Sequence, residues 1–240
     1  MNWDAVFKML PLLGEGALLT LQLLVISGIV GLVIAVPMAM ARVAKSPWLN
    51  VPPRVYIFFF RGTPLLVQLF LIYYGLGQFE AVRESFAWPV LRDAYWCAII
   101  TFSLHTGAYI TEILRGAMQA VPVGEVEAGR AVGLRTGQIY RRIILPRAAR
   151  IAIPAYGNEV ILMLKASALA STITLLDLTG MARTVYAKNY LPIETFLTAG
   201  AFYLVITYAL TQLIKQLEIR LHPDRRTPPL VVEAPTRTTP

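Results

Sequence analysis

Residues 16–41 read GALLTLQLLVISGIVGLVIAVPMAMA, a run of 26 residues that contains no charged side chain. A helix of about 20 apolar residues crosses the hydrocarbon core of a bilayer, so this run predicts a membrane-spanning helix. Asp4, Lys8 and Glu15 precede it, which is not the basic start of a cleavable signal peptide. Residues 1–15 are therefore predicted to remain as a short segment outside the membrane.

The whole chain has the composition of a membrane protein. Its hydrophobic fraction is 56% and its charged fraction 15%, with a mean hydropathy of +0.58, whereas a soluble domain has about 25% charged residues. Four further spans are predicted, over residues 55–78, 94–114, 151–176 and 195–214. The fold class expected is an all-α membrane protein with five transmembrane helices in a membrane domain over 16–217.

The basic residues divide unequally between the two sides of the predicted membrane. Segments 42–54, 115–150 and 215–240 carry 15 Lys and Arg, whereas the opposite segments carry five: Lys8, Arg83, Arg92, Arg183 and Lys188. Cytoplasmic loops collect Lys and Arg, so the N-terminus is expected outside and the C-terminus inside. This topology accounts for the net charge of +8 without a nucleic-acid partner. Residues 218–240, rich in Pro, Thr and Arg, are predicted to form a disordered cytoplasmic tail.

The cytoplasmic segment 115–150 is too long and too patterned for a simple connector. Pro122 stands where a first helical position is expected, and Gly133 allows the chain to break after this helix. Thr136 is expected to cap a second short helix that Pro146 ends. Arg141 and the arginine after it would hold that second helix on an anionic membrane surface. A projecting helix-turn-helix and a plain amphipathic surface loop both fit these residues.

Seven positions of this segment resemble the EAA loop of ATP-binding-cassette importer permeases: Glu127, Ala128, Gly129, Gly133, Ile143, Leu145 and Pro146. The spacing matches throughout, and only Gly129 departs from the pattern, where Ala is expected. Further likeness over about residues 10–220 includes Arg61 to Leu65, Gly107 to Tyr109 and Asn158 to Lys165. These stretches resemble the polar amino-acid subfamily, and within it the M-type subunits of histidine, lysine/arginine/ornithine and opine uptake systems.

The resemblance implies a permease subunit of the bacterial inner membrane that works by alternating access. The implied partners are a dimer of ATP-binding-cassette ATPases, a second homologous but non-identical permease, and a periplasmic solute-binding protein. The seven EAA positions would couple this chain to the ATPase. The implied substrate is an amino acid, with a basic one (histidine, arginine, lysine or ornithine) or an opine favoured. ATP and Mg²⁺ would be bound by the ATPase, leaving no cofactor in this chain.

Two other functions compete with this interpretation. Ionisable residues within spans also fit a transporter or channel driven by an ion gradient, although no inverted repeat is recognisable. A membrane-embedded enzyme has less support, because the sequence shows no metal-ligand set and no nucleophile–base pair. The chain also lacks a G-x-x-x-x-G-K-S/T phosphate loop, so it is not expected to hydrolyse ATP itself.

Polar residues within the predicted spans are candidates for the solute path: Gln68, His105, Tyr109, Glu159 and Lys165. An amino acid carries a carboxylate that Lys165 could meet and an ammonium that Glu159 could meet. Each residue has a structural alternative, since His105 could equally hydrogen-bond a neighbouring helix.

The other polar or special residues of the spans are expected to be structural. Arg61 is expected to anchor helix packing, and Pro64 to kink its span. Glu112 is expected to pair with Arg115, three positions along the same helix.

Overall fold

The computed structural model describes residues 3–44 and 46–221, and this part of the chain is helical almost throughout, without a strand. In chain order the main helices are α1 (Trp3–Val43), α2 (Pro47–Gly62), α3 (Leu65–Phe70), α4 (Glu80–Arg83), α5 (Trp88–Leu91), α6 (Ala94–Gln119), α7 (Val123–Ala131), α8 (Thr136–Ile139), α9 (Leu145–Ala166), α10 (Leu178–Asn189) and α11 (Pro192–Leu221). Shorter turns join them: η1 (Leu71–Gly75) and η3 (Tyr140–Ile144) are π-helical, and η2 (Leu76–Gln78) and η4 (Ser167–Ile173) are 3₁₀.

The predicted all-α membrane fold is confirmed. In the described residues α1, α6 and α11 are each long and apolar enough to cross a bilayer. Two bent pairs of helices also qualify when each pair is taken as one span, which brings the number to the expected five.

The second predicted span, 55–78, is not one straight helix. α2 ends at Gly62, and α3 begins after Thr63 and Pro64 at an angle of 104° between the two parts. Proline lacks a backbone N–H and keeps the residue before it extended, which is the conformation of Thr63. The break is therefore sharper than the kink predicted at Pro64.

The fourth predicted span, 151–176, also needs correction. The helix from Thr136 runs through η3 into α9. Pro146 lies in the first turn of α9 and therefore does not end a separate helix. A π-turn ahead of a proline accommodates its missing N–H. Arg135, not Thr136, is the N-cap residue of α8. The chain turns at Thr174, and α10 follows at 50°, a helix that the hydropathy pattern did not predict.

The helices at the two chain ends extend beyond the predicted spans. α1 begins at Trp3, so residues 3–15, predicted to lie outside the membrane, continue the helix of the first span. α11 continues to Leu221, into the segment predicted as a disordered tail. The rest of that predicted tail, residues 222–240, lies outside the described residues.

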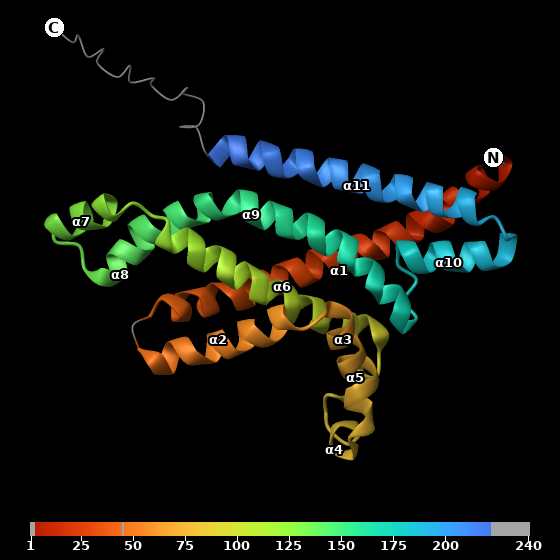
Figure 1. The fold of residues 1–240 in the computed structure, drawn as a ribbon, viewed down its shortest axis with the longest axis horizontal. Helices are drawn as coiled ribbons and strands as arrows, with labels where there is room; N and C mark the ends of the chain where they lie inside the picture. The colour runs from red at the N-terminus through yellow and green to blue at the C-terminus, as the bar shows by residue number, and fades with distance from the viewer. Residues whose placement is uncertain (1–2, 45, 222–240) are drawn as a thin grey trace, which may run out of the picture.

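The helices form an elongated bundle around α1 (Figure 1). α1 packs most extensively against α6, while α9, α10 and α11 cover other parts of its length. α7 and α8 lie at one end of the molecule, and the N-terminus and α10 lie at the other (Figure 1). α11 runs back toward the end that carries α7 and α8, so the two ends of the described chain point in opposite directions, as an odd number of spans requires.

Three apolar clusters fill the bundle along its length. The central one is built around Leu23, Leu69, Phe102, Leu164 and Ile173, all fully buried. A second cluster joins α1 to α10 and α11. The third consists largely of alanines from α1, α6 and α9 at the end that carries α7. Small residues let helix backbones approach closely where apolar lipid provides no hydrophobic drive for association.

Glycines fix the crossing of α1 and α6. A Cβ on Gly31 would stand 3.1 Å from the Gly107 nitrogen and 3.2 Å from the Ser103 carbonyl oxygen. A Cβ on Gly107 would meet the Tyr56 hydroxyl at 2.8 Å. The same Cβ would stand 3.3 Å from the Gly31 carbonyl oxygen. The two nearest neighbours of Gly31 are backbone atoms of α6, which cannot move aside independently, so the close crossing depends on Gly31.

We expect Gly31→Leu to destabilise the protein by about 1–3 kcal/mol, because the added side chain must push α6 away from α1. Thermal unfolding of the detergent-purified protein measures this loss. Gly28→Leu is the matched control on the same helix, since its Cβ would meet nothing within 4 Å. Equal melting temperatures for the two variants would contradict the close crossing.

Candidate transport pathway and coupling loop

The break between α2 and α3 is held by the side chain of Gln68. Its Nε2 donates to the carbonyl oxygens of Phe60 and Thr63, at 2.9 and 3.0 Å, and lies 2.8 Å from the Thr63 hydroxyl. The break exposes carbonyl groups that no helix can satisfy, and such groups are costly within a membrane. Gln68 is only 2% exposed, so it supplies this compensation from inside the protein.

Gln68 also connects the break to α6. Its Oε1 lies 3.1 Å from Nδ1 of His105. The amide nitrogen already donates to the break, which assigns the amide oxygen as the acceptor and Nδ1 of His105 as the donor. Nε2 of His105 is then the nitrogen available to a solute or a water molecule. His105 thus makes the contact with a neighbouring helix that was one of the two roles considered for it.

Aromatic and cationic groups continue this cluster along α6. The ring of His105 lies 4.9 Å from that of Tyr109, and the Arg61 guanidinium lies 5.0 Å above the Tyr109 ring. Arg61 is exposed at the last turn of α2, next to the break. A guanidinium over an aromatic face gains a cation–π attraction and keeps donors for another partner.

Glu159 enters the neighbourhood from α9. It is 7% exposed, on a helix that packs against α6. Gln68, His105 and Tyr109 are linked to one another and to Arg61 by the contacts above. We call these three residues, Arg61 and the buried Glu159 the polar cluster. Lys165 is exposed on the last turn of α9.

Glu112 belongs to a different group, nearer the end of the bundle that carries α7. The expected pair with Arg115 is present, with 2.7 Å between NH2 of Arg115 and Oε2 of Glu112. Arg42 of α1 adds a second cation, with its Nε 3.3 Å from Oε1. No signal in the sequence pointed to Arg42 here, because it is 70 positions away in the chain.

The loop beyond α6 forms a projecting helix and a turn. α7 follows Pro122 and ends before Gly133, which has a positive φ of 80°. The N–H of Gly133 donates to the Arg130 carbonyl at 2.9 Å, and the N–H of Leu134 donates to the Gly129 carbonyl at 3.0 Å. This is the left-handed helix ending that glycine adopts without strain.

Gly129, the one departure from the EAA pattern, has a packing role. It is buried, and a Cβ there would stand 2.6 Å from Cδ1 of Ile143. α7 therefore lies against the η3 turn more closely than an alanine would permit without a shift of Ile143. Glu125 of α7 and Arg147 of α9 add an ion pair of 3.4 Å, which is too exposed to contribute much stability.

The seven EAA positions divide between two surfaces. Gly129 is buried, and Ile143 and Leu145 are partly buried against the loop's own helices. Glu127, Ala128, Gly133 and Pro146 are exposed. A groove of about 600 Å³ runs between α7 and the start of α9, lined by Gly129, Val132, Ile143 and Pro146 among others. The loop thus exposes small residues such as Ala128 and Gly133, while its buried positions pack against its own helices.

The polar cluster consists of hydrogen-bonding and charged side chains. Within residues 3–44 and 46–221, no three His, Cys, Asp or Glu side chains gather to hold a metal ion. The arrangement offers hydrogen bonds, a cation and a carboxylate, which suit the binding of a zwitterion.

Comparison with known proteins gives the chain a family. Residues 28–223 match the family described as the binding-protein-dependent transport system inner membrane component. An octopine transport system permease of Rhizobium radiobacter is 49% identical over 212 residues, which cover 88% of this chain and 86% of the relative. The histidine/lysine/arginine/ornithine transport system permease of Escherichia coli K12 is 44% identical over 206 residues, with coverages of 85% and 87%.

Solved structures agree with this result. A chain from the crystal structure of an amino acid ABC transporter with histidines has a TM-score of 0.82 and 32% identity, covering 92% of this chain and 99% of that one. A chain from the MetNI methionine ABC transporter has a TM-score of 0.74 at 19% identity, covering 89% and 98%, and shows the shared fold alone. The chain therefore belongs to the family of binding-protein-dependent transport system inner membrane components, the permease subunits of ATP-binding-cassette importers.

Proposed function

We propose that this permease imports a basic amino acid or an opine by alternating access, driven by a separate ATPase. The observation that carries the proposal is the projecting α7 loop, whose small exposed residues suit insertion into a partner's cleft. The names of the relatives, octopine and histidine/lysine/arginine/ornithine permeases, support the solute class. ATP and Mg²⁺ are held by the ATPase dimer, and no cofactor belongs to this chain.

The proposed orientation has the N-terminus outside and the C-terminus inside. η3, which follows α8, carries Arg141 and Arg142 and lies with Arg42, Arg54 and Arg115 around one pocket, which favours the cytoplasmic side for this end of the molecule. A solute-binding protein would then meet the opposite end, near α10. A second, similar permease completes the pathway within the membrane lipid.

The polar cluster is the proposed solute path. An amino acid carries one carboxylate and one ammonium, and a basic one has a further cation. Arg61 can receive the carboxylate, while Glu159 can receive a cationic group. We assign Arg61 the role first considered for Lys165, because its guanidinium lies over the ring of Tyr109, which in turn contacts His105.

The first test is an affinity purification of the tagged chain from detergent-solubilised membranes of its own host. We expect an ATPase subunit and a second permease to co-purify, with ATPase activity that rises when a binding protein loaded with arginine or octopine is added. Glutamate-loaded protein is the negative control. Recovery of the chain alone, stable and without ATPase, would overturn the proposal in favour of a gradient-driven transporter.

Gly133→Val tests the coupling loop. Valine at a positive φ is strained by about 1–3 kcal/mol, so α7 should lose its ending and its position. We expect co-purified ATPase and solute uptake to fall by about tenfold or more. Gly137→Val is the control, since that glycine has an ordinary φ and an open environment. Normal ATPase recovery with Gly133→Val would exclude this role for the loop.

Glu159→Gln tests the solute path. The substitution keeps the shape of the side chain and removes its charge, so uptake of arginine should fall by about tenfold while uptake of a neutral amino acid changes little. Reconstituted vesicles with both radiolabelled solutes give the ratio. Glu15→Gln, at an exposed position on α1, is the control. An equal fall for both solutes would show that Glu159 is structural.

A further inference from the structure

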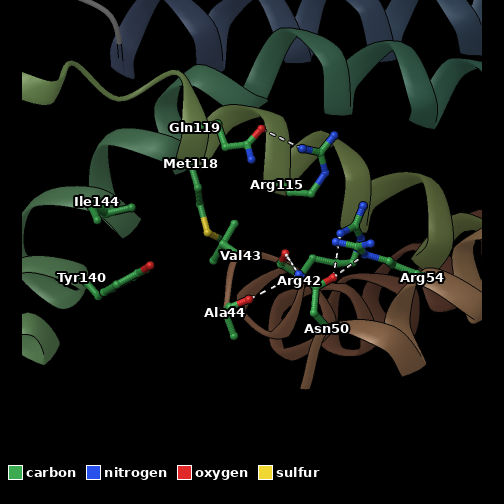
Figure 2. A pocket seen from close by; sticks show the side chains of 10 residues that line it. All are labelled: Arg42, Val43, Ala44, Asn50, Arg54, Arg115, Met118, Gln119, Tyr140 and Ile144. Atoms are coloured by element: carbon green, nitrogen blue, oxygen red, sulfur yellow. Dashed lines mark hydrogen bonds between the residues drawn. The ribbon is translucent and has the colours of Figure 1, made fainter. Parts of the chain in front are cut away.

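A polar pocket of about 550 Å³ lies where α1, α2 and α6 meet the η3 turn (Figure 2). Its walls include Arg42, Asn50, Arg54, Arg115, Gln119 and Tyr140. We propose that this pocket binds a phosphate-bearing anion, either the headgroup of an anionic phospholipid or a soluble phosphate. The proposal concerns residues outside both the polar cluster and the exposed face of α7, and it does not depend on the transported solute.

The pocket carries more positive charge than its own residues neutralise. Glu112 is the acidic partner of both Arg42 and Arg115. Arg54 forms no ion pair within the described part of the chain, and its Nε donates to the neutral side chain of Asn50 at 2.7 Å. Three guanidinium groups against one carboxylate leave two positive charges to be balanced by an anion or by solvent.

The guanidinium groups are held in place before any ligand binds. Asn50 accepts from NH1 of Arg42 at 2.9 Å as well as from Arg54, and its Nδ2 donates to the Arg42 carbonyl at 3.0 Å. NH1 of Arg115 donates to Gln119 at 2.7 Å. Figure 2 shows Arg42 and Arg54 together around Asn50, with Tyr140 across the pocket. Side chains already ordered lose little entropy on binding.

The chemistry favours phosphate over other ligands. Planar guanidinium groups match phosphate oxygens in pairs, and the Tyr140 hydroxyl can add a further donor. The excess positive charge disfavours a basic amino acid, so this pocket is no part of the proposed path for a cationic solute. Basic pockets between helices at a membrane surface are suited to phospholipid headgroups.

A bound anion would connect the α2 side of the pocket to η3, the stem of the α7 loop. Arg54 stands on α2, and Tyr140 begins η3. Binding should therefore stabilise the assembled importer in a way that depends on Arg54.

The test uses the importer purified with its co-purifying subunits and placed in phosphatidylcholine nanodiscs. Phosphatidylglycerol is added in one series and inorganic phosphate in another, and the melting temperature is followed in both. We expect one of the two to raise the melting temperature saturably, and Arg54→Gln to weaken that response by at least about tenfold. Arg220→Gln, which removes the same charge from the end of α11 outside the pocket, should leave it unchanged.

The outcomes separate the sources of the anion. A response to phosphatidylglycerol alone identifies a lipid headgroup, and a response to phosphate identifies a soluble anion. No response to either, or equal weakening by Arg54→Gln and Arg220→Gln, overturns the proposal. If the Arg54→Gln complex does not assemble, Tyr140→Phe takes its place, with a several-fold loss expected; an unchanged response in that variant would also overturn the proposal.

Discussion

Within a lipid bilayer each backbone N–H and C=O group has to find its partner inside the protein, and this requirement shapes both irregular parts of the bundle. At the first, Gln68 binds the carbonyl groups freed where α2 ends and α3 begins. At the second, Asp177 accepts from the N–H groups of Thr179 and Gly180 at the start of α10. Thr20 of α1 accepts from the N–H of Leu178 there. Each break is thus paired with a buried polar side chain.

The first break also positions polar side chains. Because Gln68 must face the break, its amide oxygen is directed at His105, and Arg61 is left at the end of α2 above Tyr109. In a straight helix over this segment, Arg61 and Gln68 would follow one another along the same helix axis. The sharp turn instead leaves Gln68 and Arg61 each in contact with a side chain of α6.

Small residues pack tightly at the end of the molecule that carries α7. Ala39, Ala117 and Ala148 allow α1, α6 and α9 to converge, and Gly129 lets α7 lie against Ile143. Such packing makes the loop a firm extension of α6 and α9, which suits the transmission of motion from a partner. Arginines at the same end leave a surplus of positive charge around Asn50.

The sequence by itself determined the class of fold, the approximate spans, and the short helix with a glycine turn in segment 115–150. Long uncharged runs and fixed spacings are local properties that hydrophobicity and glycine geometry dictate. The sequence also identified Gln68, His105, Tyr109 and Glu159 as polar residues in apolar surroundings. Pro64 marked the place of the first break, but neither the angle of that break nor the existence of α10 followed from local signals. The contact of Arg61 with Tyr109 and that of Arg42 with Glu112 were decided only in the tertiary structure. These depend on which helices lie side by side, and that is fixed by close approaches such as Gly31 against Gly107, between residues far apart in the chain.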